Sequence, residues 1–292
     1  MKHEYDILVL GGGIAGLTAA LYAARGGKKT AVIERGEAGG QLTTIASIEN
    51  YPGIGRVTGP ELAAGVARQA EEAGAAFIFA DITSADFTDG VTVATTAGTL
   101  SAAGAVVALG AVAARLGLPR ETELTGDGVH YCATCDGRFY KKRTVAVVGS
   151  TVKAVHDARY LSELCEKVFV VSAEPVAGLP ENCECVIGEP AELVGAPLSG
   201  LKVNAGGRYV TLPVTGVFVA RGFEPNSGLL RGRLELDKKG FVITDRNMKT
   251  SAPYVYAAGD IVSKPFRQAV TAAGEGAAAA HFLMRDLAAA RA

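Results

Sequence analysis

Two cysteines spaced C-x-x-C and followed at once by a carboxylate are the residues of this sequence best suited to chemistry. They are Cys132, Cys135 and Asp136, in the stretch Tyr131-Cys132-Ala133-Thr134-Cys135-Asp136-Gly137. The two thiols can close to a disulfide, and the carboxylate can pass protons to them. If the segment opens a helix, the i,i+3 spacing places both sulfur atoms on one face, and the helix N-terminus favours thiolate over thiol. The pattern predicts a redox centre with these three residues as its candidate catalytic groups.

A C-x-x-C pair can also be half of a zinc site, but such a site needs a second ligand pair at similar spacing. The remaining cysteines, Cys165, Cys183 and Cys185, supply only a C-x-C, and the histidines are scattered. We therefore favour redox chemistry and assign no metal ligands. Cys183 and Cys185 would point to the same side of a strand, which leaves a second redox pair open, although an i,i+2 disulfide is strained.

The composition is that of a globular α/β protein with many tight turns. Of the 292 residues, 49% are hydrophobic and 37 are glycine, which suits two domains. The net charge of -1 argues against nucleic acid or an anionic membrane as the main partner. The apolar runs are too short to span a membrane, and the N-terminus lacks the apolar core of a secretory signal. We expect a cytoplasmic protein, where a C-x-x-C is more plausibly catalytic than structural.

The chain opens with a strand, a glycine turn, a helix, a second strand and an acid. The apolar run 7–10 leads into Gly11-Gly12-Gly13-Ile14-Ala15-Gly16, here called the first glycine turn, and the strand 30–33 ends on Glu34. Glycines let backbone amides approach a pyrophosphate at the helix N-terminus, and the acid accepts from a ribose hydroxyl. The context required of this fingerprint is met, so the segment predicts dinucleotide binding.

Later segments supply further candidate cofactor contacts. Gly39-Gly40-Gln41-Leu42 and the turn at 49–53 are well placed to lie against a cofactor. The strand at 255–258 ends on Gly259-Asp260, which places a carboxylate where cofactor hydroxyls bind. A final helix is predicted to begin near Arg267-Gln268-Ala269, with its positive end available to an electron-rich ring.

The strand 144–148 repeats the opening pattern, but its turn does not. The second glycine turn reads Gly149-Ser150-Thr151-Val152-Lys153-Ala154, and the Cβ of Thr151 would intrude where a pyrophosphate approaches the backbone. The next strand ends in Ser172-Ala173-Glu174, with no arginine for a 2'-phosphate. Only ten residues (173–182) precede the following strand, too few for a crossover helix. Glu174 leaves open an alternative role, acceptance from the ribose of NADH.

These patterns predict an α/β fold with two Rossmann-like dinucleotide-binding domains. The first is discontinuous, with residues 1–115 and 245–292, and the second covers 116–244. The second is degenerate and shortened. It carries the C-x-x-C motif and resembles a nucleotide-binding domain that kept its core strands and lost its ligand contacts.

The sequence resembles the low-molecular-weight, flavin-dependent thioredoxin reductases over essentially its whole length. The motifs are the first glycine turn, 39–42, Cys132-Ala133-Thr134-Cys135-Asp136-Gly137, 257–260 and 267–276. The resemblance implies bound FAD, a homodimer and reduction of a Cys132-Cys135 disulfide. It further implies that Cys135 faces the flavin, Cys132 attacks the disulfide of thioredoxin, Asp136 exchanges protons, and the middle domain swivels between the two partners. His130 and Tyr131 are expected to pack rather than catalyse.

The first domain is thereby expected to bind FAD through residues of the glycine-rich segments and the two late motifs. This set is Gly11, Gly13, Ile14, Ala15, Gly16, Glu34, Arg35, Gly40, Gln41, Leu42, Asn50, Ala108, Gly110, Gly259, Asp260, Arg267, Gln268 and Ala269.

The second glycine turn departs from the NADPH-dependent members of that family. Thr151 and Lys153 replace parts of a glycine-rich turn, and Ser172-Ala173-Glu174 stands where a histidine and two arginines are expected. The sequence is therefore most similar to the ferredoxin-dependent flavin thioredoxin reductases, whose electron donor is ferredoxin. Transfer from a ferredoxin near about -400 mV to thioredoxin near about -270 mV is downhill by roughly 6 kcal/mol for two electrons. The cluster would be carried by the partner, since no cysteine run here can hold one.

Three other functions stay open. The chain could use NADH or NADPH through an altered site, act as an FAD-dependent thiol oxidase with oxygen as acceptor, or serve as a flavin-binding interaction protein. The run Lys141-Lys142-Arg143 could steer an acidic ferredoxin, although surface charge runs commonly only solvate a face.

Overall fold

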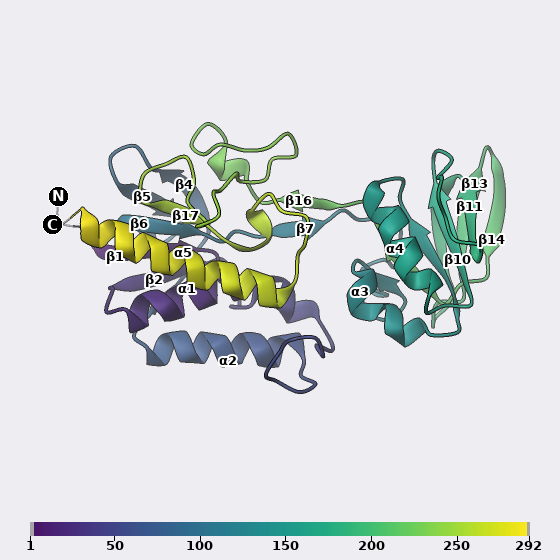
Figure 1. Ribbon diagram of the computed structural model, residues 1–292, viewed down its shortest axis with the longest axis horizontal. Coiled ribbons are helices and arrows are strands. Elements are labelled where there is room, and N and C mark those ends of the chain that lie inside the picture. Colours follow the sequence, from purple (N-terminus) through teal and green to yellow (C-terminus); the bar gives the residue numbers. More distant parts are fainter. Residues whose placement is uncertain (1–2, 291–292) are drawn as a thin grey trace. The chain divides into compact units, whose positions relative to one another are not determined.

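The computed structural model describes residues 3–290 and divides the chain into two compact units. Unit 1 contains residues up to Val112 and from Glu224 onward, and unit 2 contains Ala113–Phe223. The chain passes between the units at two neighbouring strands, β7 (Ala111–Ala113) and β16 (Phe223–Pro225), which pair with each other. Each unit is built around its own sheet (Figure 1).

The sheet of unit 1 has the order β3-β2-β1-β6-β5-β4, and β17 also pairs with β6. Its strands are β1 (Tyr5–Leu10), β2 (Thr30–Glu34), β3 (Ala76–Phe79), β4 (Ile82–Asp86), β5 (Val91–Thr95), β6 (Gly98–Val107) and β17 (Val255–Ala257). The strands β3, β2, β1, β6 and β17 run parallel, whereas β4 and β5 form an antiparallel extension.

Strands buried on both faces explain the continuous apolar runs of the N-terminal sequence. Ile7 and Val9 pack against α1 (Ile14–Arg25), α2 (Gly59–Glu72) and α5 (Ala269–Ala289). Leu8 and Leu10 point to the opposite face, into a core that also contains residues of β4, β5 and the stretch after β16. The three helices therefore cover one face of the sheet (Figure 1).

Unit 2 contains a parallel sheet in the order β11-β10-β9-β15-β8 and a separate antiparallel sheet β12-β13-β14. The parallel strands are β8 (Val129–His130), β9 (Thr144–Val148), β10 (Lys167–Ser172), β11 (Cys183–Ile187) and β15 (Gly216–Val219). The antiparallel strands are β12 (Glu189–Val194), β13 (Gly200–Ala205) and β14 (Arg208–Leu212). Helices α3 (Ala133–Asp136) and α4 (Val152–Ser162) cover one face of the parallel sheet, and the antiparallel sheet covers the other (Figure 1).

The absence of a crossover helix is confirmed. Strand β11 pairs in parallel with β10 through residues 183–187, and the structure gives residues 173–182 no helix. The guanidinium of Arg159 on α4 donates to the carbonyl oxygen of Gly178 at 2.9 Å, which ties this short connection to the helix below it. The two-domain α/β prediction is likewise confirmed.

One predicted boundary is wrong. The sequence pattern predicts that the chain re-enters the first domain at residue 245, but in the structure it does so at Glu224. The reason is core packing, because Leu230, Leu234 and Val242 are buried among the strands of unit 1. The other boundary, expected at 115/116, lies at 112/113.

Within residues 3–290, helices of the length and hydropathy needed to cross a bilayer are not found.

Candidate functional site

The first glycine turn joins β1 to α1 and is shaped by close backbone contacts. Gly11 has φ +105°, and a Cβ there would lie 2.4 Å from the carbonyl oxygen of Ala108. A Cβ on Gly16 would lie 1.9 Å from the carbonyl oxygen of Gly11. Gly13 differs, because a Cβ there would meet nothing within 4 Å. The first and last glycines are thus required by the fold, whereas the middle one leaves open space at the N-cap of α1, followed by Ile14 and Ala15 in its first turn.

Glu34 holds this turn from the end of β2. Its carboxylate accepts from the backbone amides of Gly12 and Arg35, both at 2.7 Å. The acid therefore sits directly beside the glycines, as the sequence pattern required. The Arg35 side chain points elsewhere and forms an exposed ion pair with Asp81 at 3.6 Å.

The 39–42 segment lies against the same turn. Gly39 forms a bridge with Gly13, and a Cβ on Gly40 would lie 3.1 Å from the Cα of Gly13. Gln41 and Leu42 follow in the 3-10 helix η1 (Gly40–Thr44), whose Leu42 is buried.

Two side-chain hydrogen bonds connect the early segments to the late motifs. Gln41 Nε2 donates to Asp260 Oδ2 at 3.1 Å, and Asn50 Nδ2 donates to Gln268 Oε1 at 3.1 Å. Gln268 is the N-cap of α5, so Ala269 is the first residue of that helix. Residues more than 200 positions apart are thereby brought together around the start of α1 and α5.

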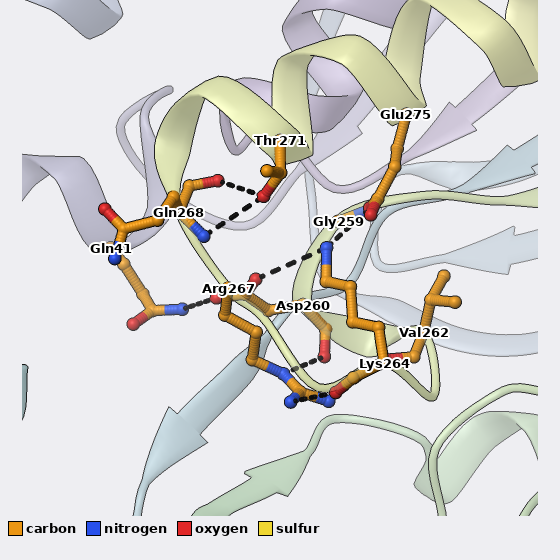
Figure 2. Close-up of polar contacts among 9 residues, drawn as sticks. All are labelled: Gln41, Gly259, Asp260, Val262, Lys264, Arg267, Gln268, Thr271 and Glu275. Atoms are coloured by element: carbon orange, nitrogen blue, oxygen red, sulfur yellow. Dashed lines mark hydrogen bonds and ion pairs between the residues drawn. The ribbon is translucent and has the colours of Figure 1, made fainter. Parts of the chain in front are cut away.

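Asp260 lies at the centre of this group (Figure 2), in the short helix η4 (Gly259–Ile261). Its Oδ1 atom is buried and has no hydrogen-bond partner among the residues that the structure describes. Lys264 Nζ lies 3.8 Å from that atom and 2.5 Å from Glu275 Oε2. Glu275 also accepts from the amide of Gly259 at 2.9 Å. A buried carboxylate oxygen normally accepts a hydrogen bond, so this one is oriented to receive a donor from a ligand.

Arg267 stabilises the loop beside Asp260. Its guanidinium donates to the carbonyl oxygens of Lys264 at 2.7 Å and Val262 at 3.1 Å, and it lies 4.3 Å from the centre of the Phe241 ring (Figure 2 shows the polar contacts). Burial lowers the pKa of Arg267, while nearby carboxylates, Asp260 foremost, oppose the shift. The described contacts give Arg267 a role in holding the loop.

Ala108 and Gly110 lie where β6 ends. The carbonyl of Ala108 contacts the first glycine turn, as described above, and Gly110 has φ +68°. The carbonyl oxygen of Gly110 accepts from the amide of Asn226 at 3.0 Å. Both residues therefore belong to the same end of the unit 1 sheet as the glycine turn.

The predicted catalytic residues lie in unit 2. Cys132 and Cys135 form a disulfide with a Cα–Cα distance of 5.3 Å, and Cys132 is the N-cap of α3. The segment does open a helix, but α3 is a single turn, so its dipole gives little support to a thiolate. Cys165, Cys183 and Cys185 are free, and burial raises the pKa of Cys165 to about 11 and raises that of Cys183. Cys183 and Cys185 therefore form no disulfide with each other in this structure.

Asp136 lies within hydrogen-bond distance of a histidine, His130, for which the sequence predicted only a packing role. His130 Nδ1 lies 3.1 Å from Asp136 Oδ2, and His130 Nε2 lies 2.7 Å from the Tyr140 hydroxyl. Burial, followed by the charges of Asp127 and Asp136, raises the pKa of Tyr140 to about 12. His130 does pack, with 5% exposure, but it also contacts the predicted proton donor.

A model of the pyridine nucleotide-disulphide oxidoreductase family matches residues 5–276. This chain belongs to that family. A thioredoxin reductase of Peptoclostridium litorale is 39% identical to this oxidoreductase over 302 residues, with 96% of each chain covered. The crystal structure of thioredoxin reductase from Streptococcus pyogenes has a TM-score of 0.92 at 34% identity and covers 98% of both chains. A ferredoxin-flavin thioredoxin reductase from Clostridium acetobutylicum has a TM-score of 0.56 at 29% identity, again covering 98% of both chains.

Thioredoxin reductases of this family bind FAD, and the residues of unit 1 fit it. The open space at Gly13 and the N-terminus of α1, which has no side-chain cap, suit a pyrophosphate. Glu34 suits a ribose, and the buried Oδ1 of Asp260 suits a cofactor hydroxyl. When bound, FAD supplies one-electron acceptance and two-electron delivery.

In the second glycine turn of this oxidoreductase, side chains take the place of glycines and have partners within unit 2. The hydroxyl of Thr151 donates to the carbonyl oxygen of Ala220 at 3.3 Å, and the ammonium of Lys153 pairs with Asp157. Glu174 is exposed two residues after the end of β10, and its amide donates to Ser172 Oγ at 3.2 Å. The positive charge nearest the turn is thus neutralised within α4.

Sequence reasoning missed His130, Lys264 and Glu275 as members of these sites. His130 stands two positions before Cys132, which was the available signal. Glu275 lies within the quoted 267–276 motif, but its contact with the amide of Gly259 depends on how α5 packs. Lys264 carried no signal beyond its spacing of four residues from Asp260.

Proposed function

We propose that this chain is a flavin thioredoxin reductase that draws electrons from a reduced ferredoxin and delivers them, through FAD and the Cys132–Cys135 disulfide, to thioredoxin. Disulfide reduction is supported by family membership and by the disulfide next to Asp136. In this proposal Cys135 takes electrons from the flavin, Cys132 attacks the disulfide of thioredoxin, and Asp136 exchanges the proton. A homodimer is proposed on the same resemblance.

The observation that carries the choice of donor is the second glycine turn. NADPH binding needs backbone amides at a helix N-terminus for its pyrophosphate and unpaired positive charge for its 2'-phosphate. Here the Thr151 side chain lies at the N-cap of α4, Lys153 is paired with Asp157, and the exposed carboxylate of Glu174 would repel a phosphate. The geometry thus supports a donor other than NADPH.

Nucleotide dependence is a second candidate, because β9, the turn and α4 retain the Rossmann arrangement. The 39% identical relative is named simply a thioredoxin reductase. In this case Glu174 would accept from the ribose of NADH.

An anaerobic flavin spectrum separates the two. The purified flavoprotein is mixed in turn with NADPH, NADH and chemically reduced ferredoxin, and oxidised thioredoxin is then added. We expect only ferredoxin to bleach the flavin and thioredoxin to restore its colour. Rapid bleaching by either nucleotide would refute the ferredoxin proposal.

A Cys135→Ser variant is the matched control for this experiment. Its flavin should still be bleached by ferredoxin, but thioredoxin should no longer restore the colour, because the disulfide is missing. Restoration of the colour in this variant would mean that electrons reach thioredoxin by another route.

A further inference from the structure

His130 is held more tightly than a packing residue requires. It ends β8, in register with Phe218 of β15, and its ring stacks on the Phe218 ring with centroids 5.2 Å apart. The Tyr140 ring meets it edge-on at 5.1 Å. A Cβ on Gly216 would lie 2.5 Å from the Tyr140 ring, so the backbone of β15 also fixes Tyr140. These contacts fix the plane of the imidazole, and the polar partners of its nitrogen atoms then fix its orientation.

In that orientation both ring nitrogens face polar partners. Nδ1 lies 3.1 Å from the Asp136 carboxylate, and Nε2 lies 2.7 Å from the Tyr140 hydroxyl. The hydroxyl can donate or accept, so the same geometry serves both an imidazolium and a neutral imidazole. Asp136 is the member nearest solvent, with a side chain 27% exposed.

We propose that Asp136, His130 and Tyr140 form a proton store for the dithiol, in which His130 is the positioning residue. The proposal rests on the proposed disulfide reduction. Two electrons from the reduced flavin break the sulfur–sulfur bond, and one proton leaves the imidazolium–carboxylate pair, giving one thiol, one thiolate, a neutral imidazole and a carboxylate. The proton passes from Nδ1 to Asp136, so Nε2 keeps its hydrogen, and the Tyr140 hydroxyl accepts from Nε2–H before and after this step.

The surrounding charges favour a store at this position. The Asp136 carboxylate faces His130 from α3, and Asp127 and Arg143 act on Tyr140 from the connections before β8 and before β9. Phe218 on the opposite strand is uncharged. Because the pKa of Tyr140 is raised to about 12, its hydroxyl keeps its proton at neutral pH and serves as a fixed dipole.

The test measures thiol reactivity, which needs neither ferredoxin nor thioredoxin. The flavoprotein is reduced anaerobically with a small dithiol, freed of reagent, and alkylated with iodoacetamide from about pH 5 to about pH 10. Three variants are compared with the wild type. His130→Asn keeps a donor toward Asp136 but does not titrate, His130→Phe fills the space without polar atoms, and His156→Asn changes a histidine with a side chain 72% exposed on α4.

We expect a two-step profile for the wild type and for His156→Asn. His130→Asn should lose the lower step and keep the alkaline rate. His130→Phe should react about three- to tenfold more slowly at neutral pH, because the Asp136 charge is then uncompensated beside the forming thiolate. If His130→Phe does not retain flavin, His130→Asn and Tyr140→Phe decide the question.

Profiles of the His130 variants that superimpose on the wild type would overturn the proposal. A two-step profile in His130→Asn would do the same, because hydrogen bonding alone would then suffice. The alkylation experiment contains neither ferredoxin nor nucleotide, so a nucleotide-dependent reductase would give the same profiles. Failure of the ferredoxin proposal is therefore detected separately, by the flavin spectrum.

Discussion

The two glycine turns have the same frame but different contents. Gly11 and Gly149 both have positive φ, and a Cβ on either would press on a carbonyl oxygen, that of Ala108 at 2.4 Å or Ala220 at 2.6 Å. The amide of Gly11 donates to the carbonyl oxygen of Ile33 on β2 at 2.9 Å, and the amide of Gly149 donates to that of Val171 on β10 at 3.0 Å. The first glycine of each turn is therefore a requirement of the strand-to-helix connection.

The positions that would touch a ligand have diverged. Gly13 leaves open space, whereas Thr151 has an exposed side chain at the corresponding place, and its hydroxyl donates to the carbonyl oxygen of Ala220. Gly16 permits contact between helix and turn, whereas Ala154 is a fully buried methyl group in unit 2. The comparison teaches that the frame of a Rossmann turn does not depend on the residues at its ligand-facing positions, because it depends on other backbone atoms.

The largest effect should come from exchanging the last position of the turns. Gly16→Ala places a methyl group 1.9 Å from the Gly11 carbonyl oxygen, so the turn must shift at a cost of about 1–3 kcal/mol. We expect the purified protein to contain less than about a tenth of the wild-type flavin. Ala154→Gly should cost about 1–2 kcal/mol of stability and leave the flavin content unchanged. Full flavin in Gly16→Ala would break the comparison.

The middle position should affect ligand binding without affecting the fold. Gly13→Thr copies the second turn into the first, and Gly13 already has φ -71°, which threonine adopts readily. We expect the unfolding free energy of the flavin-free protein to change by about 0.5 kcal/mol or less. The dissociation constant of FAD should rise at least about tenfold, as measured by flavin fluorescence titration. An unchanged affinity would mean that this space does not receive the cofactor.

The reverse exchange should restore part of a nucleotide site. Thr151→Gly combined with Glu174→Arg opens the turn and replaces a negative charge by a positive one. We expect about a tenfold tighter binding of NADPH by calorimetry, with a smaller gain for Thr151→Gly alone. If Thr151→Gly with Glu174 retained binds NADH more tightly instead, the second glycine turn is better interpreted as an altered nucleotide site.

The smallest expected effect concerns the stability of unit 1 in acid, which depends on a carboxylate of that unit. In unit 1, hydrogen bonds from Lys249 and Tyr256 lower the pKa of Asp286 to about 2. A lowered folded-state pKa contributes stability above the unfolded value of about 4, and this contribution is lost as the pH falls toward about 2. Asp286→Asn should therefore cost about 1 kcal/mol in urea unfolding at neutral pH and almost nothing near pH 2. An equal cost at both pH values would contradict this charge effect.

The sequence by itself determined the features that depend on short spacings. A strand that ends in glycine before an apolar helical pattern is local, and so is a connection of ten residues that cannot hold a crossover helix. The C-x-x-C pair was found in the same way, since residues three apart must lie close together.

Tertiary structure decided what depends on distant neighbours. The stretch 224–244 has little periodicity. It belongs to unit 1 because Leu230, Leu234 and Val242 are buried in one core with residues of the unit 1 sheet. The contact of His130 with Asp136 depends on β8 lying beside β15 while α3 turns back over it. Spacing cannot predict such contacts, because hydrogen-bond geometry is set by the packing of the whole sheet within a few tenths of an ångström.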